Sequence, residues 1–147
     1  MIVFLDTSAL LKRFVKEPGW GEVKAWCEKA DALHISIIAL VEMATAVTRK
    51  RRAGELSEAD ASRIFEAWAE ERRGMTLIPL ALETDHLREA ERLGRRYGHR
   101  AADLVHVGAA LAEARAAGTM DYRFVSADRR QVAVAREEGL DVVLIGG

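Results

Sequence analysis

The chain has 147 residues, of which half are apolar and 31% are charged, and its formal net charge is −1. This composition excludes a disordered chain, and no run approaches the roughly 18 apolar residues of a membrane span. A single cysteine, Cys27, excludes an internal disulfide and a cysteine metal cluster. We expect one domain over residues 1–147 and, because the short apolar start has no basic flank, a cytoplasmic protein without a membrane anchor.

Strand-like and helix-like patterns alternate in the first half of the chain. A Glu-Pro-Gly break at 17–19 and Gly54 separate the helical segments. The expected elements are a strand at 2–5, a helix at 9–15, a helix at 21–30, a strand at 33–36, a helix at 37–52, and a helix opened by Ser57 that carries Ile64, Phe65 and Trp68.

The second half continues the alternation. The expected elements are a strand at 75–80, a helix at 84–97 stopped by Gly98, an alanine-rich helix at 101–117, a strand at 122–126, a helix at 129–138, and a strand at 141–145. Alternating strands and helices indicate an α/β fold, a three-layer α/β/α sandwich with a central, mostly parallel sheet.

Arginine supplies 17 of the 22 basic residues and is concentrated at 49–52 and again at 92–100. The planar guanidinium group suits phosphate, so either stretch could bind nucleic acid. The alternative is a solvated helix face on which the arginines pair with nearby glutamates. The sequence leaves both interpretations open.

Two acidic residues stand in unusual surroundings in the first half. Asp6 directly follows the first strand, where an open parallel sheet collects ligands, although it could also cap the next helix. Glu42 lies in an otherwise apolar helical run, where a buried carboxylate needs a cation, a hydrogen-bond network or a raised pKa. Its alternative is a position on the wet stripe of an amphipathic helix, continued by Thr45 and Arg49.

Two further acids belong to the second half. Asp103 begins the alanine-rich helix and Asp128 follows the strand at 122–126, and either could serve only its helix N-terminus. His106 lies three residues after Asp103 on the same helix face. That spacing is compatible with metal ligation, but the apolar neighbours favour a hydrogen-bonded core histidine.

Taken together, Asp6, Glu42, Asp103 and Asp128 form an all-oxygen set. Such a set suits Mg²⁺ or Mn²⁺, which keep bound waters and so remain available to a substrate phosphate. Without a metal, clustered carboxylates do not all ionise easily, so at least one pKa should be raised.

With these residues in view, the chain resembles PIN-domain proteins, and specifically the VapC-type toxin ribonucleases of toxin-antitoxin pairs. The resemblance runs from end to end and rests on the order and spacing of short segments. These segments are VFLDTSALL at 3–11, ISIIALVE at 35–42, ADLVHVGAA at 102–110, FVSAD at 124–128 and EGL at 138–140.

The resemblance implies that the four acids gather in one pocket as catalytic, metal-binding residues, with Asp128 the most variable. It implies that Ser126 orients a water or the last carboxylate beside the substrate. It also implies a homodimer held inactive by a cognate antitoxin. We therefore expect a metal-dependent endoribonuclease acting as the toxin of a type II toxin-antitoxin pair. Separately, the proximity in sequence of Arg100 to Asp103 suggests that Arg100 or the basic stretches hold flanking phosphates of the RNA.

Three alternatives remain at this point. A PIN domain can also serve as an RNA-processing nuclease outside a toxin-antitoxin system, or as a non-catalytic module that binds RNA or protein. A phosphatase of the haloacid-dehalogenase or receiver type is disfavoured. Such proteins need an acid two positions after the nucleophilic aspartate or an acidic pair next to it, but Ser8 occupies the first position and the apolar Phe4-Leu5 precede Asp6.

Overall fold

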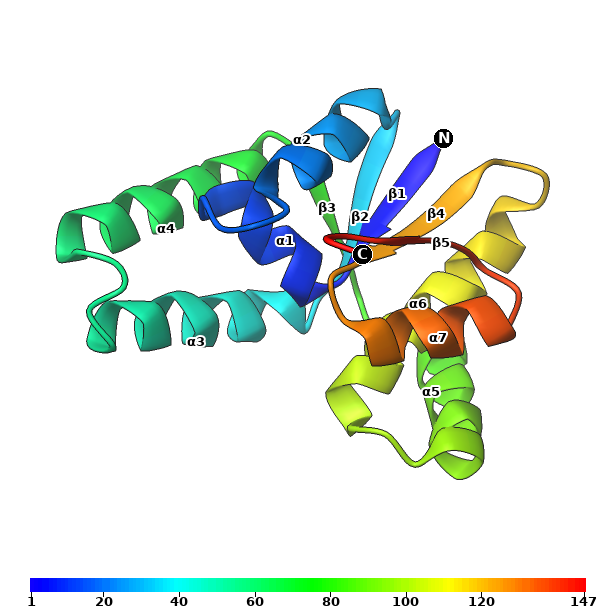
Figure 1. The fold of residues 1–147 in the computed structure, drawn as a ribbon. Helices are drawn as coiled ribbons and strands as arrows, with labels where there is room; N and C mark the ends of the chain where they lie inside the picture. Colours follow the sequence, from blue (N-terminus) through cyan, green and yellow to red (C-terminus); the bar gives the residue numbers. More distant parts are fainter.

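The computed structural model describes all 147 residues and contains one five-stranded sheet. The strand order is β3-β2-β1-β4-β5, and every neighbouring pair is parallel, so the mostly parallel sheet predicted from the sequence is parallel throughout (Figure 1). The strands are β1 (Ile2–Leu5), β2 (Ala32–Ser36), β3 (Leu77–Leu80), β4 (Tyr122–Ser126) and β5 (Asp141–Leu144).

Seven helices flank the sheet, and none is long and apolar enough to cross a membrane. They are α1 (Thr7–Phe14), α2 (Trp20–Lys29), α3 (Ala39–Arg52), α4 (Glu58–Arg73), α5 (Thr84–Tyr97), α6 (Ala101–Ala117) and α7 (Arg129–Glu137).

Side-chain alternation along β1 divides the core between the two faces of the sheet. Val3 and Leu5 belong to a core with residues of α1 to α4, whereas Ile2 and Phe4 belong to a core with residues of α5, α6 and α7. Each face therefore has its own helix layer, because successive strand side chains point to opposite faces. The predicted three-layer α/β/α fold is confirmed.

The starts of α1 and β3 differ from the sequence prediction for local reasons. Helix α1 begins at Thr7 rather than at residue 9, because the Asp6 carboxylate accepts the N–H of Ala9 and caps the helix. Strand β3 begins at Leu77 rather than at residue 75, because Met75 has a positive φ of 58° in the turn that ends α4. Turns of this kind leave little signal in the apolar pattern.

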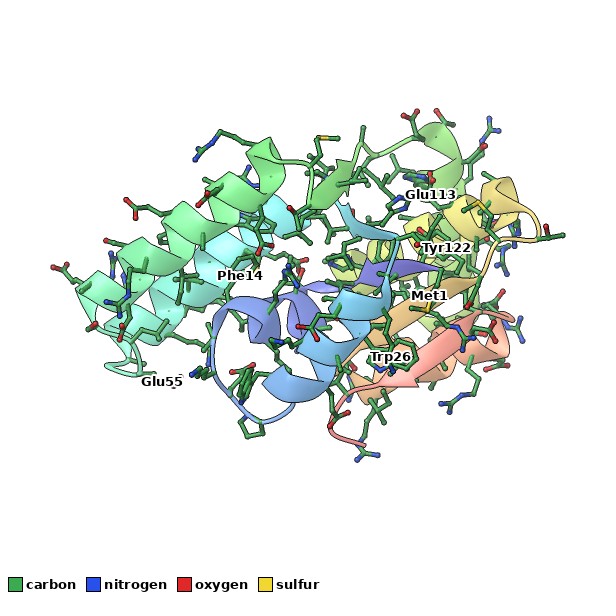
Figure 2. All side chains as sticks on the ribbon, turned by 90° about the horizontal axis from the view of Figure 1, so that it is seen from above. Met1, Phe14, Trp26, Glu55, Glu113 and Tyr122 are labelled. Carbon is green, nitrogen blue, oxygen red and sulfur yellow. The ribbon has the colours of Figure 1, made fainter.

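Helices α3 and α4 lie side by side and project away from the sheet as an arm (Figure 1). A small core of Val15, Val47, Ala61 and Ile64 joins the arm to the end of α1. Figure 2 shows Glu55 at the distal turn of this arm.

The connectivity places a crevice beside β1. The chain moves outward from β1 through β2 to β3, and then returns to add β4 on the other side of β1. Ligands in open parallel sheets bind outside the carboxyl ends of the strands at such a switch point. Figure 1 shows α1, α3, α6 and α7 all beginning near this end of the sheet.

Helices α5 and α6 pack closely at Gly108. A Cβ atom added there would lie 2.8 Å from the backbone nitrogen of Ala90 and 2.9 Å from the carbonyl oxygen of His86. A glycine at this position therefore permits the approach of the two helices. The contact matters for the crevice, because α6 also carries Asp103.

Gly108→Ala should therefore destabilise the protein. Overpacking costs about 1–3 kcal/mol, and the gain from helix propensity is only about 1 kcal/mol. Because the clashing atoms are backbone, the cost should exceed the gain, and we expect a net loss of up to about 2 kcal/mol in the free energy of unfolding measured with urea. Gly94→Ala on α5 is the matched control, since its nearest atom would be 3.9 Å away. Equal stability of the two variants would contradict the packing argument.

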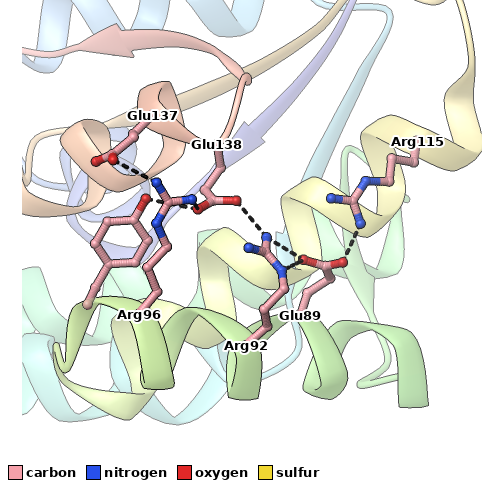
Figure 3. Close-up of polar contacts among 7 residues, drawn as sticks. Glu89, Arg92, Arg96, Arg115, Glu137 and Glu138 are labelled. Atoms are coloured by element: carbon pink, nitrogen blue, oxygen red, sulfur yellow. Dashed lines mark hydrogen bonds and ion pairs between the residues drawn. The ribbon is translucent and has the colours of Figure 1, made fainter.

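A chain of ion pairs joins α5 to the end of α7 (Figure 3). Arg92 donates to Glu138 at 2.6 Å, and Arg96 and Tyr97 donate to the other Glu138 oxygen at 2.9 and 2.8 Å. Arg92 also pairs with Glu89, which pairs with Arg115 of α6. For these arginines the structure supports the glutamate-paired helix face rather than a phosphate-binding one.

The Glu138 network should make stability depend on pH. The hydrogen bond from Arg92 is the main cause that holds the pKa of Glu138 below its ordinary value of 4.5. A lowered folded-state pKa contributes stability that is complete above about pH 4.5 and is lost as the pH falls through the folded value.

We therefore expect Glu138→Gln to lower the melting temperature at pH 7, with a difference from wild type that shrinks below about pH 4.5. The loss should be at most about 1 kcal/mol, because the arginines are half-exposed and screened by salt. Glu137→Gln, which removes one exposed Arg96 partner, is the control. A difference that stays constant from pH 3 to 7 would contradict this role.

Candidate active site

Asp6 lies directly after β1, beneath the crevice, and is fully buried. Its Oδ1 accepts the N–H of Ala9 at 2.9 Å, and the Ser8 hydroxyl lies 2.7 and 2.8 Å from its two oxygens. Ser126 donates to Oδ2 at 2.8 Å. Burial is the largest influence and raises the pKa of Asp6, partly opposed by these hydrogen bonds.

Two serines link the ends of β1 and β4 around this carboxylate. Ser8 Oγ accepts the backbone N–H of Ala127 at 2.9 Å, and Ser126 Oγ accepts the backbone N–H of Asp128 at 2.9 Å. Ser126 is itself fully buried. Its contacts orient Asp6 and the start of the Asp128 loop, and it has no surface exposed to a substrate.

Glu42 lies on the first turns of α3, with its side chain one third exposed. Its Oε1 accepts hydrogen bonds from Thr7 at 2.7 Å and from His106 Nε2 at 2.5 Å. Burial alone would raise the pKa of Glu42, but the hydrogen bonds from His106 and Thr7 outweigh it and lower that pKa. Of the three conditions that the sequence allowed, the structure shows the hydrogen-bond network.

Asp103 lies on the first turn of α6, and Gln131 of α7 donates to its Oδ1 at 3.1 Å. Burial and then the charge of Asp128 are the main causes that raise the pKa of Asp103, and Glu42 adds to them. Asp128 caps α7 by accepting the backbone N–H groups of Arg130 and Gln131. The raised pKa of Asp103 agrees with the predicted crowding of carboxylates.

An open pocket of about 620 Å³ lies over this end of the sheet. Its lining residues are Ser8, Arg100, Asp103, Ala127, Asp128, Arg129 and Arg130. All three arginines are exposed and none forms an ion pair, unlike Arg92 and Arg96 on α5. The pocket therefore combines two carboxylates with three free guanidinium groups.

The four predicted acids lie at one end of the sheet but do not share one pocket. Asp103 and Asp128 line the pocket, Asp6 is buried behind Ser8, and Glu42 faces His106. In this conformation no three acidic, histidine or cysteine side chains converge closely enough to hold a metal ion between them. Of the four acids expected in one pocket, Asp103 and Asp128 line it, and Asp6 and Glu42 lie outside its lining.

The donor chemistry nevertheless fits a hydrated divalent cation. Glu42 Oε2, Asp103 Oδ2 and Asp128 Oδ2 make no hydrogen bond within the chain, so each has free lone pairs at the crevice. Mg²⁺ is usually held by only one or two carboxylates and keeps several waters. An open set of oxygens therefore suits it better than a closed zinc site.

Several residues of this site were not predicted from the sequence. Gln131, Arg129 and Arg130 follow Asp128 directly, and the pocket shows that this first turn of α7 faces Asp103. The sequence did contain a signal for the two arginines, because residues that directly follow an acid at the end of a strand lie beside the crevice. His106 is buried and hydrogen-bonded, as the apolar neighbours predicted.

A family model for the PIN domain matches residues 3–137, which include all four acids and the whole sheet except Ile2 and β5. The chain belongs to the PIN domain family. The resemblance noted in the sequence is thereby confirmed at the level of the family. No curated protein matches the chain in sequence.

Solved structures of the same fold include proteins from several organisms. VapBC2 from Rickettsia felis, bound to a promoter DNA fragment, gives a TM-score of 0.66 at 16% identity and covers 99% of both chains. PAE2754 from Pyrobaculum aerophilum gives 0.68 at 20% identity, over 97% of this chain and 84% of that one. A toxin-antitoxin complex from Klebsiella pneumoniae gives a TM-score of 0.63 at 16% identity and covers 96% of this chain and 95% of that one. At these identities the likeness is one of fold.

Proposed function

We propose that this PIN-domain protein is a metal-dependent endoribonuclease and the VapC-type toxin of a type II toxin-antitoxin pair. The observation that carries the proposal is the meeting of carboxylates and free arginines at the switch point of the sheet. Similarity in fold to toxin-antitoxin proteins supports the toxin assignment. A cognate antitoxin, a homodimer and a cytoplasmic location belong to the same proposal.

In this proposal Asp6, Glu42, Asp103 and Asp128 hold one or two Mg²⁺ or Mn²⁺ ions. When bound, such an ion would supply activation of a water and would offset charge on the scissile phosphate, as hydrolysis of a phosphodiester bond requires. Ser8 and Ser126 keep the Asp6 carboxylate fixed, and Gln131 does the same for Asp103. Ser126 thus acts by orienting Asp6 rather than by contact with the RNA.

Cleavage of an RNA panel tests the proposed activity. With Mg²⁺ or Mn²⁺ the wild type should cut RNA, and a chelator should abolish cutting. Asp6→Asn and Asp103→Asn should each lose at least about 100-fold in rate, since metal catalysis supplies several kcal/mol. Asp121→Asn is the control, because this exposed aspartate lies at the opposite end of β4 and pairs with Arg123.

Three outcomes distinguish the candidate functions. Cutting that survives chelator or both active-site variants would contradict a metal centre at these acids. A folded wild type that cuts no RNA would favour a non-catalytic module. Cutting without growth arrest on expression, when no antitoxin is present, would favour an RNA-processing nuclease over a toxin.

The free arginines of the pocket are proposed to bind RNA phosphates, and this extends the role expected for Arg100 to Arg129 and Arg130. Binding of a labelled single-stranded RNA in chelator separates affinity from cleavage. Each single substitution to alanine should weaken binding and reduce the slope of log K against log salt by about 0.7. Arg136→Ala is the matched control, since Arg136 is exposed on the same helix without an ion pair and lies outside the pocket. An unchanged slope in all three variants would overturn this role.

A further inference from the structure

His106 joins the two halves of the site, and its role deepens the proposed function on which it rests. Glu42 belongs to α3, in the helix layer on one face of the sheet, and His106 belongs to α6 on the other face. The hydrogen bond between His106 Nε2 and Glu42 Oε1, at 2.5 Å, is the one side-chain hydrogen bond between these helices. The position of Glu42 relative to Asp103 therefore depends on this contact.

The two Glu42 oxygens have different surroundings. Oε1 receives hydrogen bonds from Thr7 and His106, while Oε2 has no hydrogen bond within the chain. The side chain is one third exposed, so the core does not cover the carboxylate completely. Two donors on one oxygen fix the rotation of the carboxylate and leave the other oxygen free for a ligand.

The other ring nitrogen of His106 indicates the direction of the hydrogen bond. Nδ1 is buried and has no hydrogen-bond partner, whereas Nε2 faces a carboxylate and the Thr7 hydroxyl at 3.2 Å. A buried N–H without an acceptor is unfavourable, so the tautomer with its proton on Nε2 fits these surroundings best. His106 then acts toward Glu42 as a fixed N–H donor.

The ring itself is held in place. His106 is 1% exposed and contacts the ring of Phe4 edge to face, with the centroids 6.5 Å apart. It lies three residues after Asp103, so one helix face presents both an acid of the site and the donor to a second acid. A rigid donor on that face sets the geometry of Glu42 with little freedom.

We propose that His106 is a positioning residue for the metal centre. Its Nε2–H holds Glu42 Oε1, so that Glu42 Oε2 and Asp103 are presented together to a divalent cation. Residues that orient metal ligands by a hydrogen bond typically affect affinity by 10–100-fold. This role requires an N–H group that reaches Glu42. It does not require the imidazole ring to bind the metal.

Mn²⁺ affinity of the metal-free protein, measured from the electron paramagnetic resonance signal of free Mn²⁺, tests the proposal without relying on activity. His106→Leu removes the donor and should weaken Mn²⁺ binding about tenfold or more. His106→Gln keeps an N–H that can reach Glu42 and should bind close to wild type. His106→Asn is equally polar but too short, and should resemble His106→Leu.

The Glu42→Gln background shows whether the effect passes through Glu42. There, adding His106→Leu should cause no further loss of Mn²⁺ affinity, because the oriented ligand is already gone. If His106→Leu does not fold by near-ultraviolet circular dichroism, the comparison of the Gln and Asn variants decides the question alone.

Two results would overturn the inference while leaving the proposed function intact. One is that wild type and the folded His106 variants bind Mn²⁺ with equal affinity. The other is that His106→Leu lowers Mn²⁺ affinity in the Glu42→Gln background as much as it does in the wild type. Absence of Mn²⁺ binding by the wild type itself would instead overturn both this inference and the proposed metal centre.

Discussion

The complete burial of the Asp6 carboxylate is the constraint on which the rest of the site depends. A buried carboxylate is tolerated only when hydrogen bonds or a cation replace its lost hydration. Here the backbone of Ala9 and the hydroxyls of Ser8 and Ser126 supply the hydrogen bonds, yet burial still raises the pKa of Asp6. These partners come from α1 and from the end of β4. The same interactions that satisfy Asp6 therefore join the two strands on either side of the switch point.

The remaining acids are placed by contacts between helices rather than by the sheet. Glu42 is held from the opposite face of the sheet by His106, and Asp103 is held by Gln131 of α7. Helix α7 is in turn joined to α5 through Glu138, which accepts from Arg92 at the helix end far from the pocket (Figure 3). The geometry of the crevice thus depends on how α3, α6 and α7 pack, since each carries one part of it.

Much of this architecture could be predicted from the chain alone. The alternation of apolar strands and amphipathic helices gave every element within about two residues, and Asp6 stood out because it ends a strand. The strand order could not be read from the pattern, because nothing local states that β4 pairs with β1. The partner of Glu42 could not be predicted either, because His106 lies 64 residues away in the sequence. In the arginine-rich stretch at 92–100 the sequence left phosphate binding and ion pairing equally open, and the ion pairs with Glu138 decide the question for Arg92 and Arg96.

We propose that a divalent cation binds where these helices meet. Anomalous diffraction from crystals soaked in Mn²⁺ tests it most directly, because the method locates the ion without reference to activity. We expect an anomalous peak in the crevice between the ends of β1 and β4, from an ion coordinated by oxygens of Asp6, Glu42, Asp103 or Asp128. A fully soaked crystal with no peak in that crevice, or with its strong peak elsewhere on the protein, would contradict it.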